Sequence, residues 1–203
     1  MKNSLTLFLS LFLLMTSCRS FDPALLQAIG EPFQTKLPSL KPVVENNIVA
    51  IVSVNGLSIQ GSNPFDVKSY FENEVKDVIT QPYQELQGVI KLKVENYEQK
   101  LRALGSFYLY ILYTPLLFGA TNRTAYSSVG VKIEVLTPSG RTVGEYSGTG
   151  DHKEKQALWK DPKSFKSEEL QRVAYLLSVK KAVEEAKSKL AQDIPRLIQE
   201  LKN

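Results

Sequence analysis

Apolar and polar residues along this chain repeat with two different periods, and these periods predict its helices and strands. Apolar residues spaced by three and four over 64–82 predict an amphipathic helix that begins at Pro64 and ends at Pro82. The same spacing returns over 167–203 and predicts a long C-terminal helix. Pro195 lies inside this second pattern, so we expect a kink or a break there, because proline removes a backbone donor and clashes with the preceding turn.

An alternation of apolar and polar residues predicts strands with one buried and one solvated face. It runs through 89–98 and returns over 129–135. The sequence Thr-Pro-Ser-Gly at 137–140 is typical of a turn, and it leads into a return strand over 141–147. The uninterrupted apolar run over 48–54 instead predicts a strand buried on both faces. Glycines in the return strand indicate that it is bulged or lies at a sheet edge: Gly144, Gly148 and Gly150.

Taken in order, these elements predict an α+β domain over 48–203, with a sheet of about four strands and two amphipathic helices on one face. Ahead of this domain, residues 18–47 contain four prolines, a density that favours extended backbone and predicts a tether. Within this tether, Asp22 and Pro23 followed by apolar residues predict a helix of one or two turns that ends at Gly30.

The first residues of the chain form a separate hydrophobic pattern. Lys2 supplies a positive charge, and the residues from Leu5 to Met15 are apolar except for Thr6 and Ser10. A charged start followed by a short apolar stretch is typical of an export signal, because a membrane span needs about 20 apolar residues. The only cysteine of the chain, Cys18, follows directly. An ordinary secretory signal with an incidental cysteine is the alternative interpretation.

The sequence Leu-Met-Thr-Ser-Cys at 14–18 resembles the lipobox of bacterial lipoproteins. The resemblance implies that a signal peptidase removes residues 1–17 and that the thiol of Cys18 carries a diacylglycerol. It also implies an anchor in the bacterial envelope. Since Arg19 and not aspartate follows the cysteine, sorting to the outer membrane, facing the periplasm, is expected. The order of elements over 48–201 further resembles small periplasmic lipoprotein domains, such as activators of penicillin-binding proteins and the soluble part of the curli secretion lipoprotein.

A long uncharged segment, the apolar insert at 103–122, separates the first two amphipathic strands. Its dense apolar centre at 107–118 is shorter than the about 20 residues of a membrane span. Three interpretations stay open: a buried core segment, a surface that enters the bilayer interface or seats a partner subunit, and a true span. An exposed apolar patch usually marks such a contact. The candidate contact residues are Phe107, Tyr108, Tyr110, Leu112, Tyr113, Leu116, Leu117 and Phe118.

A second candidate contact segment is the basic loop expected at 152–166, where lysines surround Trp159. A basic loop with an aromatic side chain is suited to anionic headgroups or to an acidic partner. Acidic residues within the segment dilute its charge, so a plain solvated loop is the alternative.

Residues for the common catalytic and metal-binding patterns are missing from the sequence. The chain has one histidine, His152, and lipidation of Cys18 would leave no thiol, so a zinc site and a Ser-His-Asp triad lack their parts. The formal net charge of +4 is far from the footprint of a nucleic-acid-binding protein. We therefore expect no metal, no cofactor, no nucleic-acid partner and no enzymatic activity.

These observations together favour a lipid-anchored envelope protein that acts by binding. The expected role is that of an accessory subunit of a transport, secretion or cell-wall assembly complex, held at the membrane through Cys18. The alternative is a self-assembling pore or scaffold, in which the apolar inserts of several copies meet in the membrane. The partner and the oligomeric state are left open by the sequence.

Overall fold

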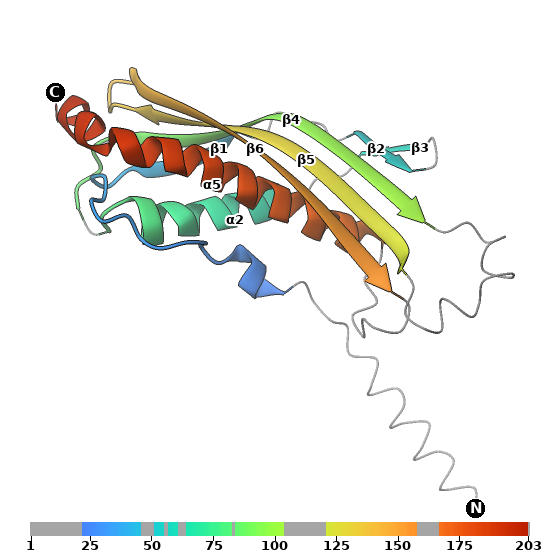
Figure 1. The fold of residues 1–203 in the computed structure, drawn as a ribbon. Coiled ribbons are helices and arrows are strands. Elements are labelled where there is room, and N and C mark those ends of the chain that lie inside the picture. The colour runs from blue at the N-terminus through green and yellow to red at the C-terminus, as the bar shows by residue number, and fades with distance from the viewer. Residues whose placement is uncertain are drawn as a thin grey trace, which may run out of the picture.

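The computed structural model describes seven segments of the chain: residues 22–45, 51–54, 57–60, 64–82, 84–103, 121–157 and 167–202. Together they form an α+β fold, in which one mixed sheet carries two helices on one of its faces (Figure 1). The predicted fold class is therefore confirmed. The apolar insert lies outside the described residues except at its two ends.

The described part of the sheet has six strands in the order β3-β2-β4-β5-β6, with β1 also paired to β4. Both β1 and β2 run parallel to β4, β1 along residues 89–93 and β2 along 99–101. All other pairs are antiparallel. The strand bounds are β1 Lys41–Glu45, β2 Ile51–Val54, β3 Leu57–Gln60, β4 Val89–Ala103, β5 Thr121–Leu136 and β6 Thr142–Ala157.

The three long strands extend well beyond the alternation that predicted them. A bulge between Val94 and Asn96 shifts the register of β4 on β5 by one residue, and the buried face then continues with Gln99 and Leu101. Their partners on β5 are Ser127 and Ala125. Polar and small residues on the buried face hide the second half of these strands from a search for apolar periodicity.

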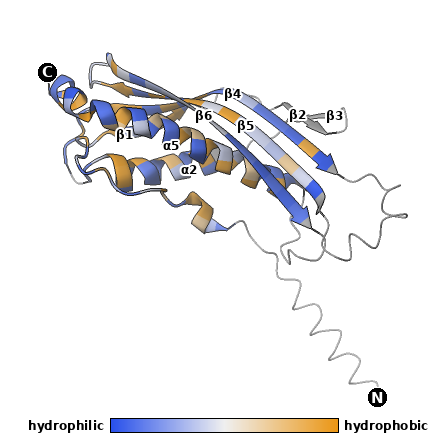
Figure 2. Cartoon of the chain, in the orientation of Figure 1, coloured by the Kyte–Doolittle hydropathy of each residue, from blue (hydrophilic) through white to orange (hydrophobic). Residues whose placement is uncertain are grey.

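Two helices lie on the same face of the sheet. The first is α2 (Pro64–Glu74), which continues into a π-helical turn, η2 (Val75–Ile79). This matches the helix predicted over 64–82. Figure 2 shows apolar and polar positions on both helices. The predicted apolar stripe is buried throughout: Val67, Phe71, Val75, Val78 and Ile79.

The second helix, α5 (Ser167–Leu201), is one continuous element through Pro195, so the break expected there does not occur. Pro195 is exposed. Water can therefore solvate the carbonyl one turn earlier, which has lost its backbone donor. Buried Ile194 and Leu197 hold the helix against the core on both sides of the proline.

Glycines of β6 allow α5 to lie directly on the sheet edge. A Cβ atom at Gly148 would lie 2.1 Å from the carbonyl oxygen of Ala182, and one at Gly150 would lie 2.1 Å from that of Ser178. Only glycine fits such an approach of helix to strand. The prediction of an edge strand is confirmed, because β6 is the last strand of the described sheet on this side.

The predicted tether over 18–47 needs a correction in its described part, 22–45. As expected, Pro23–Leu26 form a short helix, the 3-10 helix η1, which Asp22 caps. Leu37 and Leu40, however, are buried in the main core, and β1 pairs with β4. Prolines report extended backbone, and an edge strand is as extended as a tether. The prolines therefore did not distinguish between the two.

Candidate functional site

The predicted contact residues lie outside the described residues. This applies to Cys18, to Trp159 and to all the candidates between Phe107 and Phe118. Only the first part of the predicted basic loop at 152–166 is described, and it is not a loop, because 152–157 belong to β6. Residues 152–157 continue the hairpin with β5.

The ends of the described strands show where the candidate segments attach. Ala103, the last residue of β4, is paired with Arg123 of β5, and Thr121 is paired with Ala157, the last residue of β6. The segments 104–120 and 158–166 therefore leave the sheet at one common end (Figure 1). We call this end, formed by 98–103, 121–128 and 151–157, the distal end of the sheet.

The N-terminal part of the chain points toward the same end. The carbonyl of Gln27 accepts a hydrogen bond from Lys180 at 3.2 Å, and that of Ile29 accepts one from Lys187 at 2.8 Å. The chain therefore runs beside α5 in the direction of the helix, so Asp22 lies toward the start of α5. Cys18 precedes Asp22 by four residues, which span at most about 14 Å.

A buried ion cluster holds this N-terminal segment in place. Glu74 is fully buried, and its Oε2 accepts a hydrogen bond from the amide of Ile29 at 2.9 Å. Lys187, also buried, donates to Glu74, to Glu184 at 2.5 Å and to the carbonyl of Ile29. A buried charge is tolerated only when it is paired and hydrogen-bonded, and both conditions are met here.

The residues bound in this way, 26–29, form what we call the strap. All of the bonds described for the strap go to its backbone, including one from Asn73 Nδ2 to the carbonyl of Leu26 at 3.0 Å. The helices therefore hold the strap through its backbone, while the side chains of Leu26 and Ala28 pack, partly buried, against the core. Tyr70 lies under this cluster, 5.0 Å from Lys180 to the ring centre, and burial together with Glu74 and Glu184 raises the pKa of its hydroxyl.

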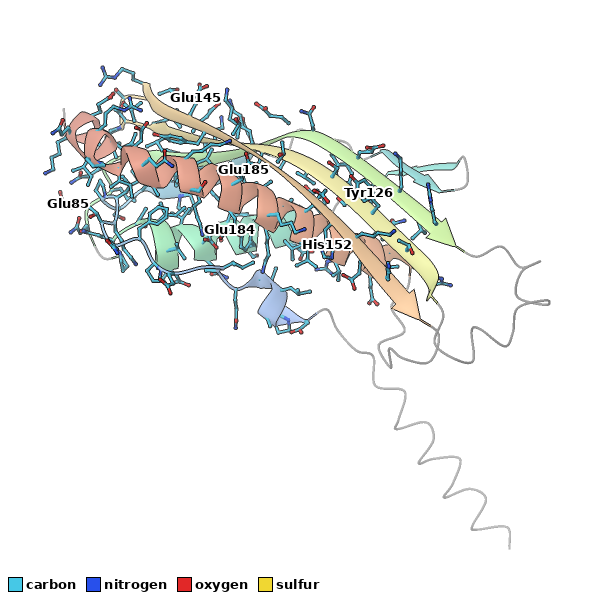
Figure 3. All side chains as sticks on the ribbon, viewed as in Figure 1. Glu85, Tyr126, Glu145, His152, Glu184 and Glu185 are labelled. Atoms are coloured by element: carbon cyan, nitrogen blue, oxygen red, sulfur yellow. The ribbon has the colours of Figure 1, made fainter. Side chains whose placement is uncertain are left out.

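Charged side chains of α5 also form hydrogen bonds with the backbone groups at the free edge of β6. Lys181 donates to the carbonyl of Asp151 at 2.8 Å, and Lys189 donates to that of Ser147 at 2.7 Å. Between them, Glu185 accepts from the amide of Thr149 at 2.8 Å (Figure 3). An uncovered strand edge is a template for pairing with another chain. Residues 147–151 of β6 are therefore protected from such pairing.

Glu185 makes this edge contact dependent on pH. The ammonium of Lys189, followed by the amide and hydroxyl of Thr149, lowers the pKa of this carboxyl to about 2. Because the unfolded value is about 4.3, the ionised carboxylate stabilises the fold above about pH 4 and ceases to do so as the pH falls toward 2. We expect Glu185→Gln to unfold at lower urea concentration than the native protein at pH 7, with the gap closing near pH 2. An equal gap at both pH values would contradict this expectation.

The single histidine has a partner on its own strand. Nε2 of His152 lies 2.9 Å from Oε2 of Glu154 (Figure 3). Within the described segments, no group of three or more His, Cys, Asp or Glu residues is placed to hold a metal ion. None of the helices in these segments is both long and apolar enough to cross a bilayer.

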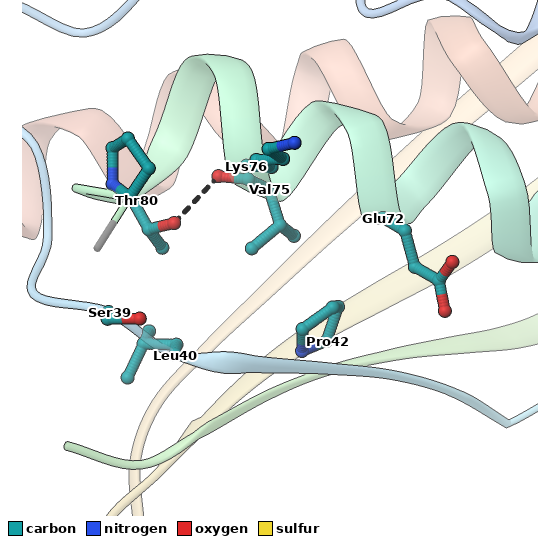
Figure 4. A pocket seen from close by; sticks show the side chains of 8 residues that line it. Ser39, Leu40, Pro42, Glu72, Val75, Lys76 and Thr80 are labelled. Atoms are coloured by element: carbon teal, nitrogen blue, oxygen red, sulfur yellow. Dashed lines mark hydrogen bonds between the residues drawn. The ribbon is translucent and has the colours of Figure 1, made fainter. Parts of the chain in front are cut away.

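A pocket of about 350 Å³ lies between β1 and the end of the first helix. One of its polar groups is already engaged, since the hydroxyl of Thr80 donates to the carbonyl of Val75 at 2.9 Å (Figure 4). A binding pocket for a small molecule needs convergent polar groups to orient its ligand. We assign no substrate to this pocket. Its lining is Ser39, Leu40, Pro42, Glu72, Val75, Lys76, Thr80 and Pro82.

Comparisons with known proteins add little to this geometry. No family model and no curated protein sequence matches the chain. One similar solved structure is the crystal structure of protein XCC0632 from Xanthomonas campestris, which carries the family description DUF330. The two chains share 11% sequence identity with a TM-score of 0.41, over 82% of this chain and 94% of the other. A similarity at this level supports no conclusion about function.

Proposed function

We propose that this chain is a lipid-anchored protein of the bacterial envelope that acts by binding, as an accessory subunit of a transport, secretion or cell-wall assembly complex. The observation that carries the proposal is the common direction of three segments. The strap leads back toward Cys18 on the side of the distal end, and both candidate contact segments leave the sheet there.

In this arrangement the anchor would also orient the domain on the membrane. With at most about 14 Å of chain between Cys18 and Asp22, a lipid on Cys18 would hold the distal end near the bilayer surface. The strap is fixed to both helices, so the domain would have a defined orientation and not swing on a long tether. The apolar insert would then face the membrane or a membrane-embedded partner, where tyrosine rings with polar tips are well placed.

Photo-cross-linking in intact cells tests this proposal. We expect a photoreactive residue at Arg102 or Arg123, which flank the insert, to capture one envelope protein. The same residue at Ser139, in the turn at the opposite end of the sheet, should capture none. Capture from Ser139 alone, or no capture from any position, would overturn the proposal. Ladders of cross-linked copies of this chain would instead support the self-assembling pore.

The anchor is tested in the same cells. Replacement of Cys18 by serine should move the protein out of the membrane fraction that survives a carbonate wash, and mass spectrometry of the native protein should find a diacylglycerol on Cys18. A native protein with a free thiol would exclude the anchor.

A further inference from the structure

The face of the sheet opposite the helices carries a cluster of four cations at the distal end. Because side chains alternate along a strand, the register places Arg102, Thr124 and Lys155 in one row across β4, β5 and β6. The next row consists of Lys100, Tyr126 and Lys153. We call these two rows the cationic face.

The cationic face differs from the rest of the same sheet surface. At the other end, three lysines are each paired with a glutamate of a neighbouring strand: Lys91 with Glu45 at 2.5 Å, Lys93 with Glu134 at 2.7 Å, and Lys132 with Glu145 at 2.8 Å. Neither row of the cationic face contains an acidic residue. Lys100 alone is described with an ion pair, to the exposed Glu98 of the following row.

The spacing of these cations suits a phosphate group. Cα atoms on strands two apart in the sheet are separated by about 10 Å, and Cα atoms two residues apart along a strand by about 7 Å. The Cα atoms of the four cations therefore lie at the corners of a rectangle of about this size. Long lysine and arginine side chains can converge over such a distance. All four cations are exposed, whereas Tyr126, which lies between them and is labelled in Figure 3, is only partly exposed.

We propose that the cationic face binds the phosphate-bearing headgroups of an anionic membrane, beside the lipid anchor. This inference rests on the proposed function, which brings the distal end within reach of the bilayer. Charge complementarity and the place where the chain leads to Cys18 both favour a membrane as the occupant. Each cation at an anionic surface strengthens association by about fivefold, and four do so by about 600-fold.

Headgroup quenching of a fluorophore tests this inference in the processed, lipidated protein. Because lipidation occupies the only native cysteine, Ser128→Cys provides a single labelling site beside the cationic face. We expect nitroxide headgroups to quench this label at least twofold more in vesicles of phosphatidylcholine with 30% phosphatidylglycerol than in phosphatidylcholine alone. Salt at 0.5 M should abolish the difference, since the Debye length then falls to about 4 Å. Quenching of a label at Ser139→Cys should change neither with phosphatidylglycerol nor with salt.

A neutralised variant and a matched control make the result specific. Replacing Lys100, Arg102, Lys153 and Lys155 by glutamine should remove the effect of phosphatidylglycerol. The control loses the same charge from exposed positions elsewhere, through Lys→Gln at 41, 68, 76 and 202, and should keep the effect. Equal quenching in both lipids, or equal loss in both variants, would overturn the inference. Cross-links from Ser128 to an acidic protein, without quenching, would assign the face to a protein and also overturn it.

A separate measurement distinguishes an error in the proposed lipid anchor from an error in the proposed cationic face. If mass spectrometry shows a free thiol on Cys18, the anchor is excluded, and the cationic face is then tested by sedimentation of the purified unlipidated protein with the same vesicles. Retention only with phosphatidylglycerol, lost in the neutralised variant, would support the cationic face without the anchor. No retention would overturn it.

Discussion

Replacing Gly148 with alanine is expected to lower the free energy of unfolding by about 3 kcal/mol, the upper end of the usual cost of overpacking. The reason is the nearest atom: a Cβ at this position would lie 2.1 Å from the backbone carbonyl of Ala182 and 2.7 Å from the amide of Ala186. Backbone cannot rotate away as a flexible side chain can. The helix α5 would have to lift from β6, and the contacts between α5 and the sheet would loosen with it.

A matched control lies on the other face of the same sheet. A Cβ at Gly130 of β5 would meet only the side chain and backbone of Asn96, at 3.4 Å and beyond, so Gly130→Ala should change stability by less than about 0.5 kcal/mol. Urea denaturation followed by circular dichroism measures both. Gly150→Ala, 2.1 Å from the carbonyl of Ser178, should behave like Gly148→Ala. Equal unfolding midpoints for Gly148→Ala and Gly130→Ala would show that α5 does not lie on β6 in this way.

The fold could be predicted where the core follows a regular apolar period. Ile90, Leu92 and Ile133 alternate with charged residues, and each is fully buried on the helix face as the pattern indicates. The period fails after Val94, because the bulge shifts the register and polar Gln99 and Ser127 take the buried positions. A tertiary contact satisfies Gln99, whose side-chain amide donates to the carbonyl of Gln171 at 2.8 Å, a partner that no local pattern reveals.

The candidate site was predictable only in part. Two of the cations, Lys100 and Arg102, lie just before the apolar insert. The other two, Lys153 and Lys155, lie on β6, and the whole of β5 separates them from the insert. Only the pairing of β4, β5 and β6 therefore brings the four together. The strap was hidden for another reason. Its bonds go to its backbone, and its sequence therefore carries no sign of the buried Glu74 and Lys187 that hold it. A signal was present in the helices: both residues occupy positions among apolar neighbours that face the core.

The second large effect is expected at this buried ion pair. Lys187→Met leaves the carboxylate of Glu74, fully buried, without its cation, and removal of one partner of a buried pair costs about 3–5 kcal/mol. The carbonyl of Ile29 loses its donor in the same step. We expect a large drop in the urea midpoint. We also expect limited proteolysis to cleave the variant near residues 26–29 at protease concentrations that leave the native protein intact.

Two further variants separate the charge from the packing. Lys189→Met, two residues along the same helix but half-exposed, should cost no more than about 1 kcal/mol, because exposed ion pairs contribute little. The double variant Glu74→Leu with Lys187→Met should cost less than Lys187→Met alone, since no unpaired charge is left in the core. Its strap should still be cleaved, because Ile29 has lost both of its partners. A double variant less stable than the single one would show that Glu74 is not desolvated, and that the strap is held by packing and not by this pair.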